Sequence, residues 1–169
     1  VWRKVRSLVG NEADARDCYQ TVFLEAFQFS EKTPVEDWSR LLGRIARLRS
    51  LDVLRGQYRQ ADRHDAAISV DAATSRSPSV DEKLDAKELS QQLRFALAEI
   101  SSEQAEVFVM RYVEQLTYDE IAQRTGSNRN AVGAMLSRAR KQLRELLDAS
   151  EVHSTTSGRS TPTAGGNEL

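Results

Sequence analysis

The chain has 169 residues, of which 40% are hydrophobic and 29% are charged, and its formal net charge is −1. This composition is typical of a globular protein and excludes a disordered one, and the length allows one domain or two small ones. No apolar run approaches the roughly 18–20 residues of a membrane-spanning helix. The first residues, VWRKVRSLVG, lack the apolar core of a signal peptide, so we expect a cytoplasmic protein.

Few aromatic residues and three prolines favour helices over a β-sandwich, which needs frequent turns. The sequence therefore predicts an all-α fold of two small helical domains. Residues 1–60 form the first domain, 61–80 a flexible polar linker, and 81–149 the second domain. Residues 150–169 are rich in Ser, Thr and Gly, and we expect a disordered tail because nothing there offsets the entropy of ordering.

Three helices are predicted in the first domain: residues 1–9, about 13–29 and about 36–60. The first helix begins part-way through its pattern, and we expect a turn or two to be missing. It ends at Gly10-Asn11. In the second helix an apolar stripe at helical spacing is expected to face the core, and it consists of Val22, Phe23, Ala26 and Phe27. The single Cys18 suits a reducing compartment and lacks the neighbours of a catalytic nucleophile.

The third predicted helix is rich in arginine. The arginines of this helix are Arg40, Arg44, Arg47, Arg49, Arg55 and Arg59. On a helical projection all but Arg49 fall within about a third of the circumference. Solvated faces usually mix both signs of charge, so we favour phosphate contact over a plain solvated face. Trp38 stands at the start of this helix, where it either packs in the core or stacks on an unpaired base.

The second domain is expected to begin with a helix over residues 81–100, capped by Ser79. Ser101 and Ser102 then cap a helix over 103–115. The core contacts expected from that helix are Phe108, Tyr112 and Val113.

The stretch LTYDEIAQRTGSNRNAVGAMLSRARK, residues 116–141, has the signals of a helix–turn–helix. Thr117 and Glu120 have the spacing of a capping box, Gly126 ends the first helix, and Asn128 caps a second helix over 129 to about 147. Inward anchors are expected at Ile121, Ala122, Val132, Met135, Leu136, Ala139 and Leu143. An ordinary helical hairpin is the alternative, but this spacing fits a DNA-reading motif better.

The outward face of the second helix carries Arg129, Asn130, Gly133, Ala134, Ser137 and Lys141. Arginine suits guanine and asparagine suits adenine through bidentate hydrogen bonds, so Arg129 and Asn130 are candidate base readers. Arg138 and Lys141 follow them with Arg140 and Arg144 and suit phosphate contacts, which give affinity without sequence information.

Four segments resemble the extracytoplasmic-function group of bacterial sigma factors in the sigma-70 family, over residues 1 to about 149. The segments are DARDCYQTVFLEAF, RIARLRSLDVLR, EVFVMRYVEQLTYDEIAQRTG and LSRARKQLREL. The resemblance implies a non-catalytic subunit without cofactor or metal that binds core RNA polymerase and promoter DNA. It also implies an anti-sigma protein as a candidate partner.

By the same resemblance, the first domain would bind the polymerase clamp and the −10 promoter element, the latter through the Arg-rich helix and the loop before it. The second domain would bind the −35 element and the polymerase flap. The polymerase-binding residues would be Asp14, Asp17, Gln20, Phe23 and Leu24. The DNA-binding residues would be Trp38, Arg40, Arg44, Arg47, Arg55, Arg59, Asn128, Arg129, Asn130, Gly133, Ala134, Ser137, Arg138 and Lys141.

Three departures separate this chain from the family pattern. Fewer aromatic residues stand in Trp38–Leu42, Leu48 replaces the usual Asn, and Ala131-Val132-Gly133-Ala134-Met135 stands where relatives have Thr-Val-Lys-Ser-Arg. The promoter preference of relatives is therefore not transferred. Two other hypotheses stay open: a free-standing helix–turn–helix regulator, and a protein-interaction adaptor whose reading helix has lost DNA contact. An enzyme is least supported, because no Gly-rich phosphate loop or His/Cys cluster is present.

Overall fold

A computed structural model describes residues 1–65 and 81–156, and across these ranges it contains seven α-helices and no strand. The helices are α1 (Trp2–Val9), α2 (Glu12–Lys32), α3 (Trp38–Asp65), α4 (Asp81–Glu99), α5 (Ser102–Tyr112), α6 (Tyr118–Thr125) and α7 (Arg129–Thr156). The all-α prediction is confirmed. We call residues 1–65 the first half and 81–156 the second half. None of the described helices is both long and apolar enough to cross a membrane.

The turn between α1 and α2 lies at Gly10-Asn11, as predicted. Gly10 has φ 79°, a backbone conformation that glycine adopts without steric cost. The side chain of Asn11 accepts a hydrogen bond from the Ala13 amide at 2.8 Å and so caps α2. A Cβ on Gly10 would lie 2.8 Å from the guanidinium carbon of Arg94, so α4 packs directly on this turn.

The predicted caps of the second half are present. Ser101 accepts from the Gln104 amide at 3.4 Å. In the capping box of α6, Thr117 Oγ1 accepts from the Glu120 amide at 3.3 Å, and Glu120 Oε2 accepts from the Thr117 amide at 2.8 Å. Gly126 then ends α6 in the left-handed conformation, with φ 67°.

Three helices extend beyond their predicted ends, and the shortest extension is that of α2, which continues to Lys32. α3 continues to Asp65 and α7 to Thr156, so the predicted disorder from residue 150 is wrong for residues 150–156. No Gly or Pro occurs in residues 57–65 or 134–157, so nothing in the backbone stops either helix. Residues 66–80 of the predicted linker, the Ser79 cap and residues 157–169 of the predicted tail lie outside the described residues.

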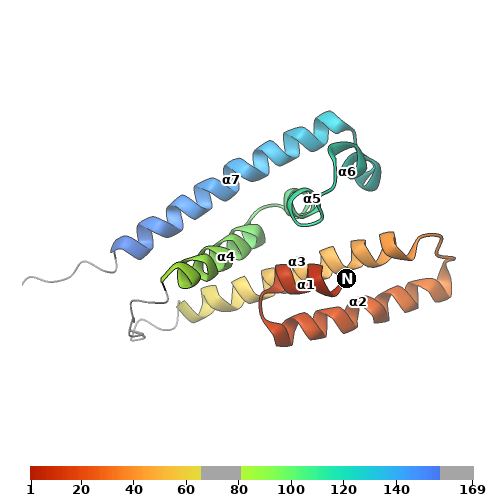
Figure 1. The fold of residues 1–169 in the computed structure, drawn as a ribbon, viewed down its shortest axis with the longest axis horizontal. Coiled ribbons are helices and arrows are strands. Elements are labelled where there is room, and N and C mark those ends of the chain that lie inside the picture. The colour runs from red at the N-terminus through yellow and green to blue at the C-terminus, as the bar shows by residue number, and fades with distance from the viewer. Residues whose placement is uncertain (66–80, 157–169) are drawn as a thin grey trace, which may run out of the picture.

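Three groups of buried residues hold the helices together. One joins α1, α2 and α3 around Val5, Val22 and Ala46, and a second joins α5, α6 and α7 around Ile121 and Val132. The third, which we call the junction core, contains residues of both halves. Its members are Leu8, Leu51, Leu54, Ala96, Leu97, Ile100, Ala105, Val109, Ala139 and Leu143. Figure 1 shows α4 and α5 between α3 on one side and α7 on the other. The sequence predicted two tethered units, and the structure packs them against each other.

Two predicted core sets need correction. On α2, Val22 and Ala26 are buried, but Phe23 and Phe27 are 41% and 63% exposed. The buried face of α2 is instead completed by Ala15 and Cys18, which lie one turn apart and face α1 and α3.

On α5 the predicted contact Tyr112 is 47% exposed, while Phe108 and Val113 are only partly buried. The buried residues are Ala105, Val107, Val109 and Met110. α5 lies between α3 and the α6–α7 pair, so it buries two faces, which a search for one apolar stripe does not find.

The capping box makes a testable prediction about pH. Hydrogen bonds from the backbone and then the side chain of Thr117 lower the pKa of Glu120. A carboxylate whose pKa is lower in the folded state stabilises the fold above its unfolded pKa, and this is lost as the pH falls through the folded value. Denaturant unfolding across pH should show Glu120→Gln less stable than wild type at neutral pH and equal to it in acid. The difference should be smaller but still present in a Thr117→Ala background, which removes the side-chain hydrogen bond to Glu120 and keeps the backbone one; an unchanged difference would contradict the side-chain contribution.

Candidate nucleic-acid interface

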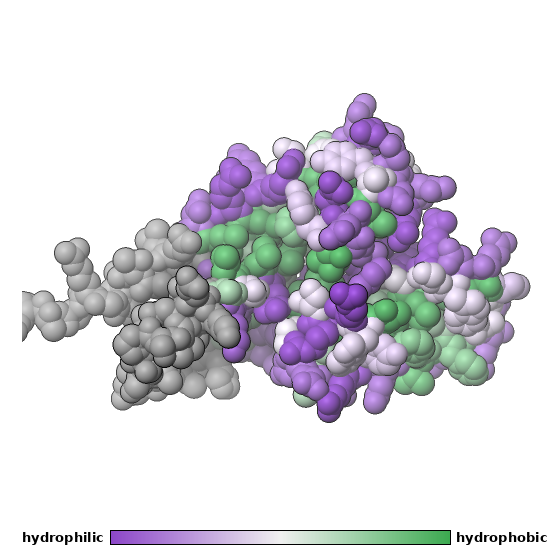
Figure 2. Space-filling view, viewed as in Figure 1, coloured by the Kyte–Doolittle hydropathy of each residue, from purple (hydrophilic) through white to green (hydrophobic). Residues whose placement is uncertain are grey.

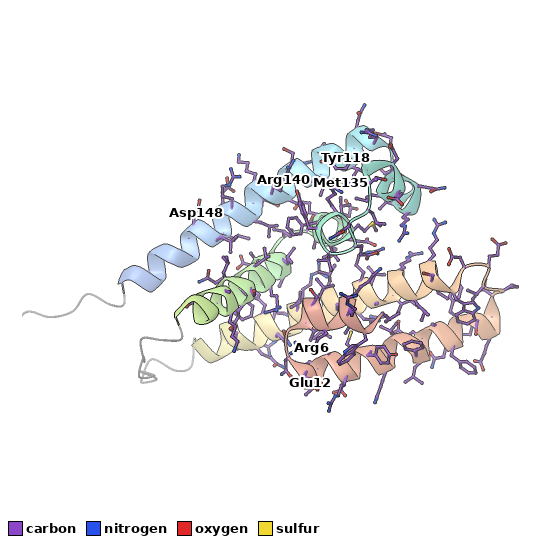
Figure 3. All side chains as sticks on the ribbon, viewed as in Figure 1. Arg6, Glu12, Tyr118, Met135, Arg140 and Asp148 are labelled. Carbon is purple, nitrogen blue, oxygen red and sulfur yellow. The ribbon has the colours of Figure 1, made fainter. Side chains whose placement is uncertain are left out.

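The crossing of α6 and α7 is set by apolar packing. Ile121, Val132 and Leu136 are fully buried in one core. Tyr118 and Met135 pack partly buried against it, and Figure 3 shows both where α6 meets α7. The predicted inward stripe is confirmed, because all its residues are buried except Met135, which is partly buried, and this packing fixes the second helix of the motif against the first.

The opposite face of α7 is open. Asn130, Ala134, Ser137, Arg138 and Lys141 are exposed, so the structure brings the predicted reading residues together on one accessible surface. Gly133 is partly exposed beside them. A Cβ added there would meet Tyr118 Cε2 at 3.7 Å, which is ordinary contact.

Asn128, predicted to contact DNA, has a structural role at the start of α7. Its side-chain oxygen accepts from the Ala131 amide at 2.9 Å. This satisfies one of the free amides at the helix start.

Arg129 has a partner that the sequence reading did not find. Its Nη1 lies 2.5 Å from Asp119 Oδ2, and its guanidinium carbon lies 6.0 Å from the centre of the Tyr118 ring. Both charged side chains are about two-thirds exposed, at 65% and 67%. An exposed ion pair contributes about 1 kcal/mol or less, so Asp119 orients Arg129 at little cost and can give way to a base contact.

The cationic side chains further along α7 have weaker ion-pair partners than Arg129 has. Lys141 Nζ lies 3.8 Å from Glu145 Oε1, with both side chains exposed. Arg138 Nε donates to the Ala134 carbonyl at 3.3 Å, which leaves its guanidinium uncompensated by an acid among the described residues. These cations are accessible for the phosphate contacts predicted for them.

The arginines of α3 divide into two groups. Arg40, Arg44 and Arg59 are exposed, and Arg55 lies partly buried, 3.7 Å from Asp52. Arg47 is different, because only 4% of its side chain is exposed.

Arg47 pairs with Glu106 at 2.9 Å and with Glu114 at 2.7 Å, both from the second half. In this arrangement it is not accessible to DNA, contrary to the prediction. The helical projection found its face correctly. The projection could not show that the second half covers that face.

The start of α3 is exposed. Trp38 is 47% exposed, so the core-packing interpretation is wrong, and base stacking stays a prediction. Asp37 Oδ1 accepts from the Arg40 amide at 2.9 Å and holds this first turn in place.

α2 carries an apolar face that none of the other described helices covers. Phe23, Leu24 and Phe27 are 41%, 63% and 63% exposed, and with exposed Gln20 they follow helical spacing. Figure 2 shows hydrophobic side chains gathered at the lower right, where Figure 1 draws α2. A contiguous exposed apolar patch marks an interaction surface. Phe27 belongs to it, although the sequence reading placed Phe27 in the core.

Two acidic residues predicted beside this face behave differently. Asp17 is exposed, whereas Asp14 is partly buried. Asp14 Oδ2 accepts from Gln57 Nε2 at 2.6 Å, so it also ties α2 to α3.

Cys18 is buried, and burial raises the pKa of its thiol, which disfavours the reactive thiolate. Its sulfur lies 3.8 Å from Ser50 Oγ, consistent with a packing role. No group of three or more potential metal ligands occurs among the residues that the structure places.

A rigidly packed α6–α7 pair with an exposed second helix defines a helix–turn–helix of the DNA-binding class. Residues 90–143 match the family described as Sigma-70, region 4. The chain therefore contains a sigma-70 region 4 domain, and the predicted sigma-70 helix–turn–helix is confirmed over these residues.

The chain is also similar to a solved structure, the co-crystal structure of the sigma factor RpoE with the anti-sigma factor NepR from Bartonella quintana. The identity is 21% and the TM-score 0.48, over 87% of this chain and 89% of that one.

Two glycines of the motif give a matched pair of substitutions. Gly133→Ala should raise the free energy of unfolding by about 1 kcal/mol, because alanine is the better helix former and its Cβ meets only Tyr118 at 3.7 Å. Gly126→Ala should lower it by about 1 kcal/mol through left-handed strain alone, since nothing lies within 4 Å of that Cβ. Denaturant unfolding measures both. Destabilisation by Gly133→Ala would show that the Tyr118 ring cannot accommodate a methyl group.

Proposed function

We propose that this chain is a sigma factor of the extracytoplasmic-function group, which binds core RNA polymerase and directs it to specific promoters. The region 4 domain with an unobstructed reading face on α7 carries the proposal. Sequence-specific recognition of the −35 element through Arg129 and Asn130 follows from the position of both side chains at the exposed start of that helix.

The first half supplies the second part of the proposal. The apolar face of α2 at Phe23, Leu24 and Phe27 has the exposure expected of a protein-binding surface. We assign it to the polymerase clamp, with Asp17 and Gln20 at its edge. Arg40, Arg44 and Arg59 of α3, with the exposed Trp38, are assigned to the −10 element. A free-standing regulator would not need the α2 face. The RpoE of the solved structure is in complex with the anti-sigma factor NepR. An anti-sigma partner for this chain stays a prediction.

Run-off transcription with purified core polymerase on a pool of genomic DNA fragments tests the function directly. The chain should produce transcripts from a limited set of fragments that share a sequence upstream of their start sites. DNA binding without promoter-dependent transcription would favour the free-standing regulator. Binding with core polymerase that is indifferent to the −35 sequence would favour the adaptor.

The reading face makes a separable prediction. Arg129→Ala or Asn130→Ala should relax the preference at single positions of the −35 sequence, at about 1–3 kcal/mol per lost base contact. Arg138→Ala or Lys141→Ala should weaken binding to all sequences and reduce its salt dependence. Competition binding against randomised −35 sites at several salt concentrations separates the two effects. A change of sequence choice in Arg138→Ala would show that the helix docks in another register.

The α2 face is tested by a pair of leucines. Leu24 is 63% exposed on this face, and Leu89 is 53% exposed on α4. Leu24→Ser should lower the affinity for core polymerase about tenfold or more, as loss of a central apolar contact does, whereas Leu89→Ser serves as the matched control. Fluorescence anisotropy titration of the full chain with core polymerase measures both. Equal effects of the two substitutions would remove the assignment.

A further inference from the structure

A groove of about 790 Å³ lies where the turn between α1 and α2 meets α4. Figure 3 shows Arg6 close to this turn. None of the residues that we assign to DNA lines the groove, so the proposed function leaves it without a role.

The charged side chains of the groove are mostly cationic. Arg6 of α1 and Lys87 and Arg94 of α4 line it together with one acid, Asp14 of α2. Three cations and one carboxylate give the lining a net charge of +2. The hydrogen-bond donor to Asp14 is the neutral amide of Gln57, at 2.6 Å, so none of the three cations is paired with that carboxylate. The groove therefore has an excess of positive charge.

Arg94 reaches the groove across a glycine. A Cβ on Gly10 would lie 2.8 Å from Arg94 Cζ and 2.9 Å from Arg94 Nε, closer than two such atoms can approach. The guanidinium thus packs directly on the backbone of the turn. Its Nε is buried and has no hydrogen-bond partner among the described residues. Buried donors in folded proteins are almost always hydrogen-bonded, to protein, water or a bound ion.

A second guanidinium meets the same turn. Arg6 Nη1 donates to the Gly10 carbonyl, so Arg6 and Arg94 both contact Gly10 from different helices. Burial, and then the charge of Arg6, lower the pKa of Arg94. Arginine nevertheless stays protonated at neutral pH. Two like charges are thus held close together on one turn, and a bound anion would offset their repulsion.

The donor set favours a phosphate over other anions. The guanidinium fork matches two oxygens of a phosphate at once, and a lysine adds a compact point charge. Because the cations lie on two helices, a diphosphate can contact more of them than a single phosphate can. Val9 and Phe95 add apolar lining, and the volume is within the range of small-molecule sites.

We propose that this groove binds a small phosphorylated molecule, whose diphosphate group is held by Arg6 and Arg94 over the Gly10 turn and by Lys87 at the edge of the groove. The proposal is independent of the proposed function, because it uses none of the residues assigned to DNA. A ligand held by α1 and α4 together would also stabilise the packing of these two helices.

Isothermal titration of the full chain with pyrophosphate, at constant ionic strength, tests the site. The wild-type chain should bind one pyrophosphate, and more tightly than inorganic phosphate. Arg94→Gln and Arg6→Gln should each weaken pyrophosphate binding about tenfold or more, as loss of a charge-assisted hydrogen bond does. Arg94→Lys should weaken it less than Arg94→Gln, because lysine keeps the charge and loses the fork.

Arg3→Gln is the matched control. Arg3 is exposed on the same helix as Arg6 and is not a lining residue of the groove, so the substitution removes the same charge and should leave pyrophosphate affinity nearly unchanged. Absence of saturable binding to the wild-type chain would overturn the proposal. Equal losses in Arg3→Gln and Arg94→Gln would also overturn it, because they would show a general charge effect.

Thermal unfolding separates ligand binding from damage to the fold. Pyrophosphate should raise the unfolding midpoint of the wild type and of Arg3→Gln, since a ligand that binds the folded state stabilises it. It should leave the midpoint of Arg94→Gln nearly unchanged, whatever the stability of that variant without ligand. An equal rise in Arg94→Gln would show that pyrophosphate binds elsewhere and would remove the site.

A competition experiment tests nucleic acid as the alternative occupant. A random-sequence duplex added to the wild-type chain should leave the pyrophosphate affinity nearly unchanged, because the groove is separate from the exposed cations of α7. Displacement of pyrophosphate by the duplex, together with weaker duplex binding by Arg94→Gln, would show that the groove serves nucleic acid and would overturn the assignment to a small molecule.

Discussion

The guanidinium of Arg47 lies almost entirely out of water, and it can do so only because Glu106 and Glu114 meet it from the other half of the chain. The arrangement of the molecule depends on this requirement. Burying the Arg47 guanidinium without one of the two carboxylates would destabilise the fold strongly. The carboxylates of α5 and of the loop after it must therefore pack on α3. The junction core around Leu54 and Leu97 then follows the same line of contact. Charge fixes the register of the interface, and apolar area supplies most of its stability.

This arrangement reconciles a weakly acidic chain with two basic surfaces. The formal net charge is −1, and the structure shows how the acids are used. Glu106 and Glu114 neutralise α3 at the interface, and Asp119 orients Arg129 at the reading turn. Neutralisation is therefore local and specific.

Much of the local structure could be predicted from the sequence, because its causes are local. The capping box at Thr117 and Glu120, the left-handed Gly126 and the caps at Asn11 and Ser101 are each decided by a few neighbouring residues. The extended ends of α3 and α7 were missed because polar composition was taken as a helix stop, where no Gly or Pro was present. Whether Phe27, Tyr112 and Arg47 are buried or exposed could not be predicted, because the burial of each side chain depends on which other helix covers its face. Periodicity identifies a face but not its neighbour.

The same distinction explains the reading helix, in which Ala131–Met135 offers no basic side chain. The structure shows that Gly133 is not required for space, since a Cβ there would make ordinary contact with Tyr118. In the proposed docking on DNA, the small residues Gly133 and Ala134 would let the helix approach the base edges closely. Hydrogen bonding is then left to Arg129 and Asn130 at the turn, and charge to Arg138 and Lys141 further along. In this proposal affinity and sequence choice would be carried by different turns of one helix, so either could change without the other.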